Sequence, residues 1–364
     1  MSSSFSPSSS LSPPSLRSSP FSLLPPELTQ LIIEHTIPHS FYSETYRSRQ
    51  STLRSLCLVS KPFHHFARPL LLATLWINCS REDKGWTMIH ANRDVKLLCR
   101  EIILGRFLQD STLGLDLAGY AALRTLVING RKADAFDLSI LGQLPLLSVL
   151  RLCRVALSAS TSVSLPSLYE LSLFQIESFA NHAHFLDPRS LPSLRLFAYY
   201  HGDGLLPGVE QGIARLLHQL DSFSLDYHLI GSMKSELLKK LDPITLFDTE
   251  VYELEDLEEK IQVSHLRIGG SFYGSENYEE VKQLLSQAQP SLMSTIYLPL
   301  STSPAAPGKN EDVSNQSELW EYLTARGIEV IYEATPGQWY FNSGFSEHFL
   351  DNMREERRNK QEKV

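Results

Sequence analysis

The chain of 364 residues has few cysteines and no long apolar run. Its four cysteines, Cys57, Cys79, Cys99 and Cys153, are scattered, and no Cys-x-x-Cys occurs. They therefore predict neither a disulfide framework nor a structural zinc site, and a reducing compartment, the cytoplasm or the nucleus, is expected. No stretch of 18 apolar residues is present, so we expect no membrane span and no membrane partner.

The sequence also lacks an excess of basic residues. Lys and Arg number 33 against 41 Asp and Glu, which gives a formal net charge of −8. Residues 1–80 hold six basic and three acidic side chains, so the negative charge lies in the rest of the chain. An acidic main body repels phosphate backbones, and we therefore expect no nucleic-acid partner.

Common catalytic motifs are absent as well. The sequence contains no Gly-x-Ser-x-Gly elbow and no His-Glu-x-x-His spacing, and its histidines do not fall in a ligand pattern. We predict no catalytic residue, no metal site and no cofactor, so the chain is not expected to be an enzyme. His64 and His65 are expected on an exposed helix face.

One glycine-rich segment offers a competing hypothesis. Gly202-Asp203-Gly204, followed by Gly208, precedes an apolar helical run and superficially resembles a phosphate-binding turn. Asp203 would repel phosphate, Pro207 interrupts the cradle, and no Lys-Ser/Thr follows. An enzyme that uses this turn would need a pocket with converging polar groups near Asp203.

The first twenty residues are mostly Ser and Pro. We predict that residues 1–20 are disordered, because they have little apolar surface to bury. They also lack the basic start and apolar run of a signal peptide. Their Ser-Pro pairs are either chance pairs in a solvated tail or sites for proline-directed phosphorylation.

A first short helix is predicted at Pro25-Pro26, since proline fits the first turn of a helix. Leu28, Leu31 and Ile32 follow at helical spacing and form one apolar stripe. A polar stretch, residues 39–50, comes next and is interpreted as a link.

Two more helices are predicted before residue 74. One covers residues 52–59 with Ser51 as its cap, and Ser60 caps the next, which carries Phe63 on its apolar side. Pro69 is expected to start a separate short turn. A helical unit of about fifty residues cannot cover its own apolar faces, so it needs a neighbouring domain or another protein.

From residue 75 onward, short apolar triplets of the form Leu-x-x-Leu-x-Leu recur in steps of 21 to 32 residues. The triplets end at Ile77, Leu104, Ile128, Leu152, Leu173, Leu196, Leu225, Leu246, Ile268, Leu298 and Val330. This period is typical of a coil in which each turn adds one short strand to a parallel sheet. We therefore predict an α/β fold, with a non-repeating doubly wound sheet as the alternative.

Two further segments have two interpretations each. The acidic run over residues 242–259 is either a solvated helix on the outer side of the coil or a surface that steers a basic substrate. The aromatic residues between 339 and 349 either cap the last turn of the coil or form a substrate-binding patch.

The two motifs Leu24-Pro25-Pro26-Glu27-Leu28 and Leu56-Cys57-Leu58-Val59-Ser60-Lys61-Pro62-Phe63 resemble an F-box. That family has Leu-Pro-x-Glu-Leu followed by a Leu/Val-Ser-Lys-x-Phe helix, and Ala67-Arg68-Pro69-Leu70-Leu71 resembles its fungal branch. The later region is similar to the degenerate leucine-rich repeats that often follow an F-box. The family usually has Asn or Cys three positions after each triplet, where this chain has Arg131, Val155, Ile176, Tyr199, His228 and Ser271.

The resemblance implies four parts: a disordered tail over residues 1–20, an F-box-like helical domain over 21–74, a leucine-rich-repeat-like solenoid with a parallel sheet over 75–340, and a cap with a charged tail over 341–364. It implies a substrate-recognition subunit of a Skp-cullin-F-box ubiquitin ligase, which binds a Skp-family adaptor and an unknown protein substrate. The adaptor-binding residues implied are Leu24, Pro25, Leu28, Ile32, Val59, Ser60 and Phe63, some of which are expected to pack internally. The alternative is a protein-binding repeat scaffold with no ubiquitin role.

Overall fold

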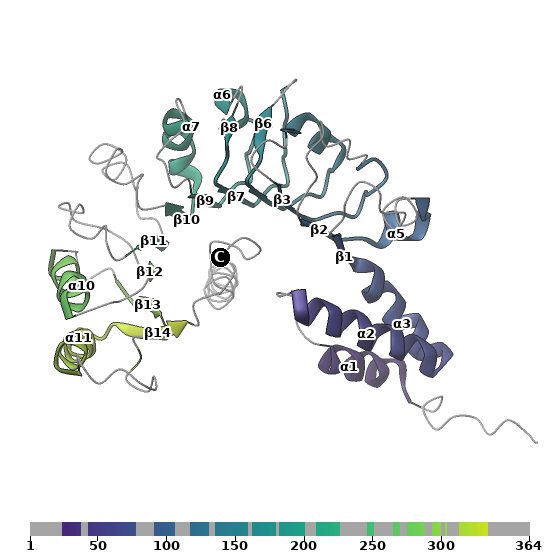
Figure 1. Cartoon of the computed structure of the whole chain (residues 1–364), viewed down its shortest axis with the longest axis horizontal. Helices are drawn as coiled ribbons and strands as arrows, with labels where there is room; N and C mark the ends of the chain where they lie inside the picture. Colours follow the sequence, from purple (N-terminus) through teal and green to yellow (C-terminus); the bar gives the residue numbers. More distant parts are fainter. Residues whose placement is uncertain are drawn as a thin grey trace, which may run out of the picture. The chain divides into compact units, whose positions relative to one another are not determined.

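A computed structural model divides the chain into two compact units, Met1–Leu71 (unit 1) and Leu72–Val364 (unit 2) (Figure 1). The structure describes residues 24–37, 43–77, 91–105, 117–130, 135–158, 162–179, 182–200, 209–225, 246–250, 265–269, 275–287, 293–299, 303 and 313–333.

Unit 1 is built from helices. α1 (Pro26–Thr36) begins where it was predicted, with Pro25 as its cap residue and a proline in the first turn. The amide of Thr29 donates to the carbonyl of Pro25 at 3.0 Å, which closes that turn. α2 (Ser43–Val59) and α3 (Lys61–Ala73) follow. The small core contains Ile33, Ile37, Leu53, Phe63 and Ala67.

The start predicted for the second helix is wrong. α2 begins at Ser43, so Ser51 lies inside the helix and does not cap it. Gln50 and Leu53 are buried three residues apart, and Cys57 one turn later is half-buried. This spacing places one face of α2 on the core. Residues 43–50 of the predicted link therefore belong to the helix.

Two expectations for the third helix are also wrong. α3 continues through Pro69 to Ala73, because the apolar face that begins at Phe63 carries on past the proline. The hydroxyl of Ser60 is buried and has no hydrogen-bond partner among the described residues, so it does not act as a cap. The carbonyl of Ser60 instead accepts a bond from the amide of His64 at 2.9 Å.

Unit 2 contains a parallel sheet of eleven strands whose order in space is their order in the chain. The strands are β1 (Thr74–Ile77), β2 (Glu101–Gly105), β3 (Thr125–Asn129), β5 (Val149–Cys153), β7 (Glu170–Phe174), β9 (Leu196–Tyr200), β10 (Ser222–Leu225), β11 (Leu246–Glu250), β12 (His265–Gly269), β13 (Thr295–Pro299) and β14 (Glu329–Glu333). Each pairs in parallel with the strand before it. The predicted α/β fold with a parallel sheet is confirmed.

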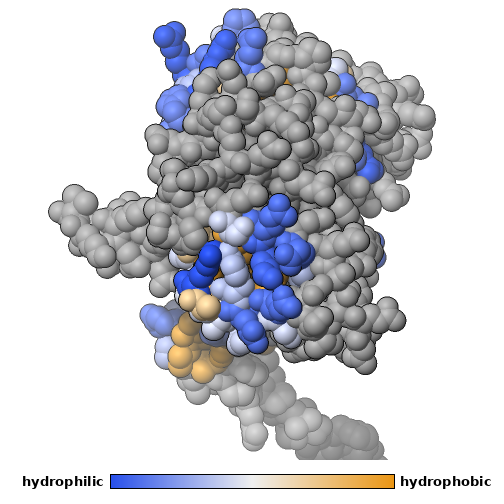
Figure 2. All heavy atoms as spheres, turned by 90° about the vertical axis from the view of Figure 1, so that its left-hand side faces the viewer, coloured by the Kyte–Doolittle hydropathy of each residue, from blue (hydrophilic) through white to orange (hydrophobic). Residues whose placement is uncertain are grey.

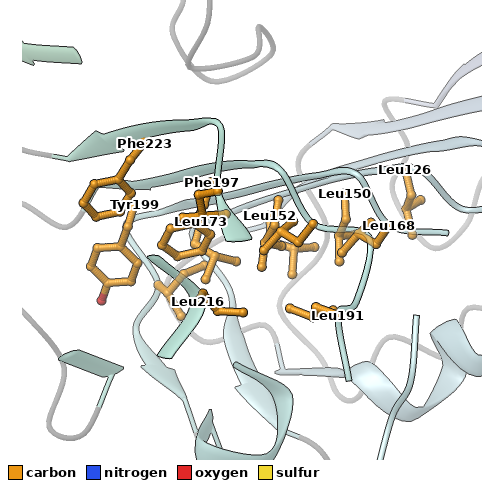
Figure 3. Close-up of a cluster of buried hydrophobic side chains, with 14 of the residues drawn as sticks. Leu126, Leu150, Leu152, Leu168, Leu173, Leu191, Phe197, Tyr199, Leu216 and Phe223 are labelled. Atoms are coloured by element: carbon orange, nitrogen blue, oxygen red, sulfur yellow. The ribbon is translucent and has the colours of Figure 1, made fainter. Parts of the chain in front are cut away.

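From β1 to β10 the strands share one register, and their second and fourth positions are apolar. Successive side chains of a strand point to opposite faces, so these two positions line the same face of the sheet. We call the side chains at these positions the apolar ladder. From β1 to β10, the members in the buried cluster are Leu75, Ile77, Ile102, Leu104, Leu126, Ile128, Leu150, Leu152, Leu171, Leu173, Phe197, Tyr199 and Phe223. Figure 3 shows part of this cluster.

Eight of the eleven predicted triplet ends fall on the fourth position, and three do not. The residues at that position of β9, β11 and β14 are Tyr199, Thr249 and Tyr332, in place of Leu196, Leu246 and Val330. In β9 the triplet is Leu194, Phe197 and Tyr199. The prediction placed its end at Leu196, three residues too early, because Phe197 and Tyr199 stand in place of leucines.

The described helices of unit 2 lie on the side of the apolar ladder. They are α5 (Arg93–Leu98), η2 (Leu138–Gln143), α6 (His182–Phe185), α7 (Val209–Leu216), η3 (Leu217–Gln219), α10 (Ser275–Gln287) and α11 (Val313–Ala325). Val95, Ile213, Leu285 and Leu323, for example, belong to the same buried cluster as the ladder. Each strand thus gains its apolar cover from the segment that follows or precedes it.

A second parallel sheet of three short strands was not predicted. It consists of β4 (Ala135–Asp137), β6 (Ala156–Ser158) and β8 (Ser178–Phe179), in that order. Strands of two or three residues are too short to show a period of two in the sequence. Val155 and Ile176, which precede β6 and β8, are fully buried in the main cluster.

Several predictions concern residues outside the described ranges. Within the acidic run, residues 246–250 form a strand, so the helix interpretation is wrong for this part. The rest of that run, the tail over 1–20, the glycine turn near Asp203 and the aromatic segment over 339–349 lie outside the described residues.

Candidate functional site

Most of the described surface in the view of Figure 2 is hydrophilic, and apolar atoms gather in one small area. Eight large apolar side chains of the described residues are exposed, and five of them belong to unit 1. These five are Leu28, Leu31, Ile32, Leu58 and Val59. We call them the exposed apolar set. Because unit 1 has far fewer residues than unit 2, this distribution is strongly uneven.

α1 carries two apolar stripes side by side. Thr29, Ile33 and Ile37, spaced four residues apart, are buried and face the core of unit 1. Leu28 and Ile32 lie one position before Thr29 and Ile33, and with Leu31 they are 41–47% exposed. A helix that needs only one apolar face to fold therefore presents a second one to the surroundings.

The C-terminal end of α2 has the same character. Leu53 is fully buried, whereas Leu58 is 87% exposed and Val59 46% exposed. α1 and α2 are consecutive helices that share a core through Ile33 and Leu53, so the start of α1 and the end of α2 lie toward the same end of the unit (Figure 1).

The structure divides the seven predicted site residues. Leu28, Ile32 and Val59 are exposed members of the apolar set, and Pro25 before them is exposed as well. The remaining three differ in burial: Leu24 and Ser60 are half-buried, and Phe63 is buried in the core. Phe63 thus belongs to the internal group and holds the three helices together.

Two members of the set were not among the predicted site residues. Leu31 lies one turn from Leu28 on the same stripe, and Leu58 directly precedes Val59. Leu31 was visible in the sequence as part of the apolar stripe after the first motif, and Leu58 as an apolar residue of the second motif. What the sequence could not give is their exposure, which depends on how the helices rotate against the core.

Exposed basic side chains lie on α2 and α3. Arg47, Arg54, Lys61 and Arg68 are exposed, and Glu27 is the acidic residue in the first turn of α1. Of these, Arg54 lies one turn before Leu58 and Lys61 lies two residues after Val59, so positive charge adjoins the apolar set, which favours a partner with acidic residues around an apolar centre.

The thiols of the three described cysteines have a raised pKa. Burial raises the pKa of the Cys99 and Cys153 thiols to about 12, so both stay protonated near neutral pH. Burial also raises the pKa of Cys57, opposed by the nearby Arg68. His64 and His65 are exposed, as predicted.

Within the described ranges, no group of three or more His, Cys, Asp or Glu side chains could hold a metal ion. In the same ranges, none of the helices combines the length and the apolar character that a membrane crossing requires. The chain matches no family model and no curated protein sequence. The interpretation of the site therefore rests on its own residues.

Proposed function

We propose that this chain is the substrate-recognition subunit of a Skp-cullin-F-box ubiquitin ligase of the cytoplasm or nucleus, and that a Skp-family adaptor binds the exposed apolar set. The observation that carries the proposal is the exposure of Leu28, Leu58 and Val59 within the two F-box-like motifs, and of Leu31 and Ile32 on the helix that the first motif begins. Three of the five exposed side chains thus belong to the motifs that resemble an F-box, and the other two lie within one turn of the first motif.

The packing of unit 1 supports a docking role for this set. Its core already contains Ile33, Leu53, Phe63 and Ala67, so the exposed side chains are not needed to complete it. Burying the exposed half of one such side chain is worth about 1 kcal/mol, or roughly fivefold in affinity. Five of them at one end of a helical unit give a sizeable apolar contribution to binding.

The sheet of unit 2 supports the assignment of the remaining chain to degenerate leucine-rich repeats. Its strands follow chain order and share one register with an apolar ladder, as stacked repeats do. Val155 and Ile176 lie three residues after Leu152 and Leu173, where the family usually has Asn or Cys, and both are fully buried. Apolar packing therefore fills the place of the usual side-chain hydrogen bonds.

In this function the chain needs no catalytic residue, because the adaptor links it to a cullin ligase whose other subunits transfer ubiquitin. The repeats would hold the protein substrate. The positive charges of Arg54 and Lys61 beside the apolar set fit an adaptor surface with acidic residues around its apolar centre.

The test is a pull-down of a purified Skp-family adaptor with the full chain. The chain should retain the adaptor, and the double variant Leu28→Asp with Val59→Asp should lose it, because two charges would be buried without partners. Leu97→Asp is a matched control, since Leu97 is an exposed leucine of unit 2. A folded chain that retains no adaptor would refute the proposal. The alternative function, a protein-binding repeat scaffold with no ubiquitin role, would then remain.

A further inference from the structure

The same tight turn precedes five strands of the main sheet, β3, β5, β7, β9 and β10. In each turn the amide of the fourth residue donates to the carbonyl of the first, at 3.1 or 3.2 Å. The turns cover residues 120–123, 144–147, 165–168, 191–194 and 217–220. Their first and last residues are buried in the main cluster, as Figure 3 shows for Leu168 and Leu191, so the two central residues of each turn are the outer ones.

Hydrogen bonds join neighbouring turns into one row. The amide of Tyr169, the residue after the third turn, donates to the carbonyl of Ser148, the residue after the second, at 2.8 Å, and the corresponding bonds join the other turns. Oγ of Ser167 also donates to the carbonyl of Pro145 at 2.8 Å. The turns therefore lie side by side in the order of their strands, and we call this row the turn edge. All of it lies within the described ranges.

The outer side of the turn edge is apolar along its first four turns. The exposed apolar residues there are Ala121, Pro145, Leu146, Pro166 and Pro192, of which Leu146 is 47% exposed. From β3 to β9 this row spans about 14 Å, the length of about four residues of an extended chain. Proline fixes its own backbone angle, and the turns are bonded to each other, so the row loses little freedom when it binds.

Positive charge adjoins the turn edge. The residues directly before β2, β3, β5, β7 and β9 are Arg100, Arg124, Ser148, Tyr169 and Arg195, three of them basic and none acidic. The side chains of Arg100 and Arg124 are exposed, and within the described part of the chain neither guanidinium has a bonded partner. The amide of Arg124 donates to the carbonyl of Arg100 at 2.8 Å, so the two residues occupy equivalent places on neighbouring strands.

We propose that the turn edge binds an extended segment of a protein partner, with apolar side chains on the row of turns and acidic side chains on Arg100 and Arg124. A guanidinium pairs with a carboxylate through two parallel hydrogen bonds, which fixes the segment in one register. Backbone amides of the edge already donate to neighbouring turns, so the segment is recognised by side chains and not as an added strand.

The exposed row of the first four turns has no aromatic side chain on which a base could stack, which favours a protein segment over a nucleic acid. Under the proposed function this segment belongs to the substrate, and only that name depends on the ubiquitin-ligase role. Binding to the turn edge needs no adaptor.

A phage-displayed library of short random peptides, selected on the purified full chain without an adaptor, tests the proposal. The affinities of the selected peptides are then measured by fluorescence anisotropy. We expect peptides that combine Asp or Glu with large apolar residues. Leu146→Asp and Arg124→Glu, made singly, should each weaken their binding at least about tenfold, because one buries a charge and the other repels the acidic residues. Leu146→Met and Arg124→Lys should stay within about threefold.

Both side chains are exposed, so all four variants should melt at the temperature of the unmodified chain. A variant that melts lower is set aside, and the variant at the other position decides. Selected peptides with unchanged affinity for Leu146→Asp and Arg124→Glu would overturn the proposal. A selection without acidic peptides, or tighter binding of a labelled oligouridylate than of any peptide, would do so as well. Since no adaptor is present, the result is independent of the pull-down that tests the ubiquitin-ligase role.

Discussion

Unit 1 and the main sheet of unit 2 treat their apolar side chains differently. The sheet buries its apolar ladder, and the described residues of unit 2 leave only Leu97, Leu146 and Trp320 as large exposed apolar side chains. Unit 1 buries a core of five residues and leaves five other large apolar side chains exposed. The difference teaches that exposed large apolar side chains are not a general property of the described residues. Their concentration in unit 1 therefore indicates a binding surface.

The largest effect on stability is expected in the apolar ladder. Leu150 is fully buried in the middle of the cluster shown in Figure 3. Leu150→Ala should lower the free energy of unfolding by about 2–5 kcal/mol, because the cavity left behind cannot collapse fully. Urea denaturation measures this, with Leu97→Ala as the exposed control. A loss below about 1 kcal/mol would show that the ladder is loosely packed.

A glycine on α7 should give the next largest effect. A Cβ at Gly212 would lie 2.6 Å from Cβ of Leu186, whereas a Cβ at Gly142 would have no neighbour within 4 Å. Gly212→Ala should cost about 1–3 kcal/mol through overpacking. Gly142→Ala should be neutral or slightly stabilising, and the two melting temperatures should therefore move apart. Equal shifts would contradict the close contact between α7 and the segment after α6.

The two regions should also differ in thiol reactivity. Cys57 in unit 1 is half-buried, whereas Cys99 is buried and donates to the carbonyl of Glu101 at 3.3 Å. Alkylation at pH 8 should modify Cys57 at least about a hundredfold faster than Cys99, since the thiolate is the reactive form. Labelling of both at one rate would mean that the core of unit 2 opens readily.

The same burial of Cys99 makes stability depend on pH. Its thiol has a pKa of about 12 in the folded chain against 9.0 as the ordinary value. Between about pH 9 and pH 12 the Cys99 thiol therefore keeps its proton in the folded state and loses it in the unfolded state. The contribution of this thiol to the free energy of unfolding is complete below about pH 9 and is lost as the pH rises toward 12. Cys99→Ala should flatten the fall in stability above pH 9, measured by denaturation at several pH values.

The smallest effect is expected in the exposed apolar set. Leu58→Ser should change the free energy of unfolding by no more than about 0.5 kcal/mol, because Leu58 is 87% exposed. Chemical denaturation of the variant measures this. A loss of 2 kcal/mol or more would mean that Leu58 packs inside the protein, and the comparison between the two regions would fail.

The sequence predicted the elements whose signals are strong and local. The period of apolar triplets predicted the parallel sheet, and the prolines at the start of α1 predicted where that helix begins. It misplaced β9, because Phe197 and Tyr199 stand where a leucine pattern expects leucines. The sequence also predicted a polar link up to Gln50, although α2 begins at Ser43, because the buried Gln50 gives no apolar signal.

Exposure was harder to predict than secondary structure. Leu28 and Phe63 look equally apolar in the two motifs, yet one is exposed and the other lies in the core. The difference depends on how three helices rotate against each other, and helical spacing alone does not determine that.

The central claim is that the exposed apolar set of unit 1 binds a Skp-family adaptor, and calorimetric titration of the full chain with that adaptor tests it most directly. Leu31→Asp should weaken the affinity at least about thirtyfold, because an unpaired charge would be buried in an apolar contact. Leu97→Asp, an equally exposed leucine of unit 2, should leave the affinity within about twofold. Equal affinities for both variants, or no binding by the unmodified chain, would contradict the claim.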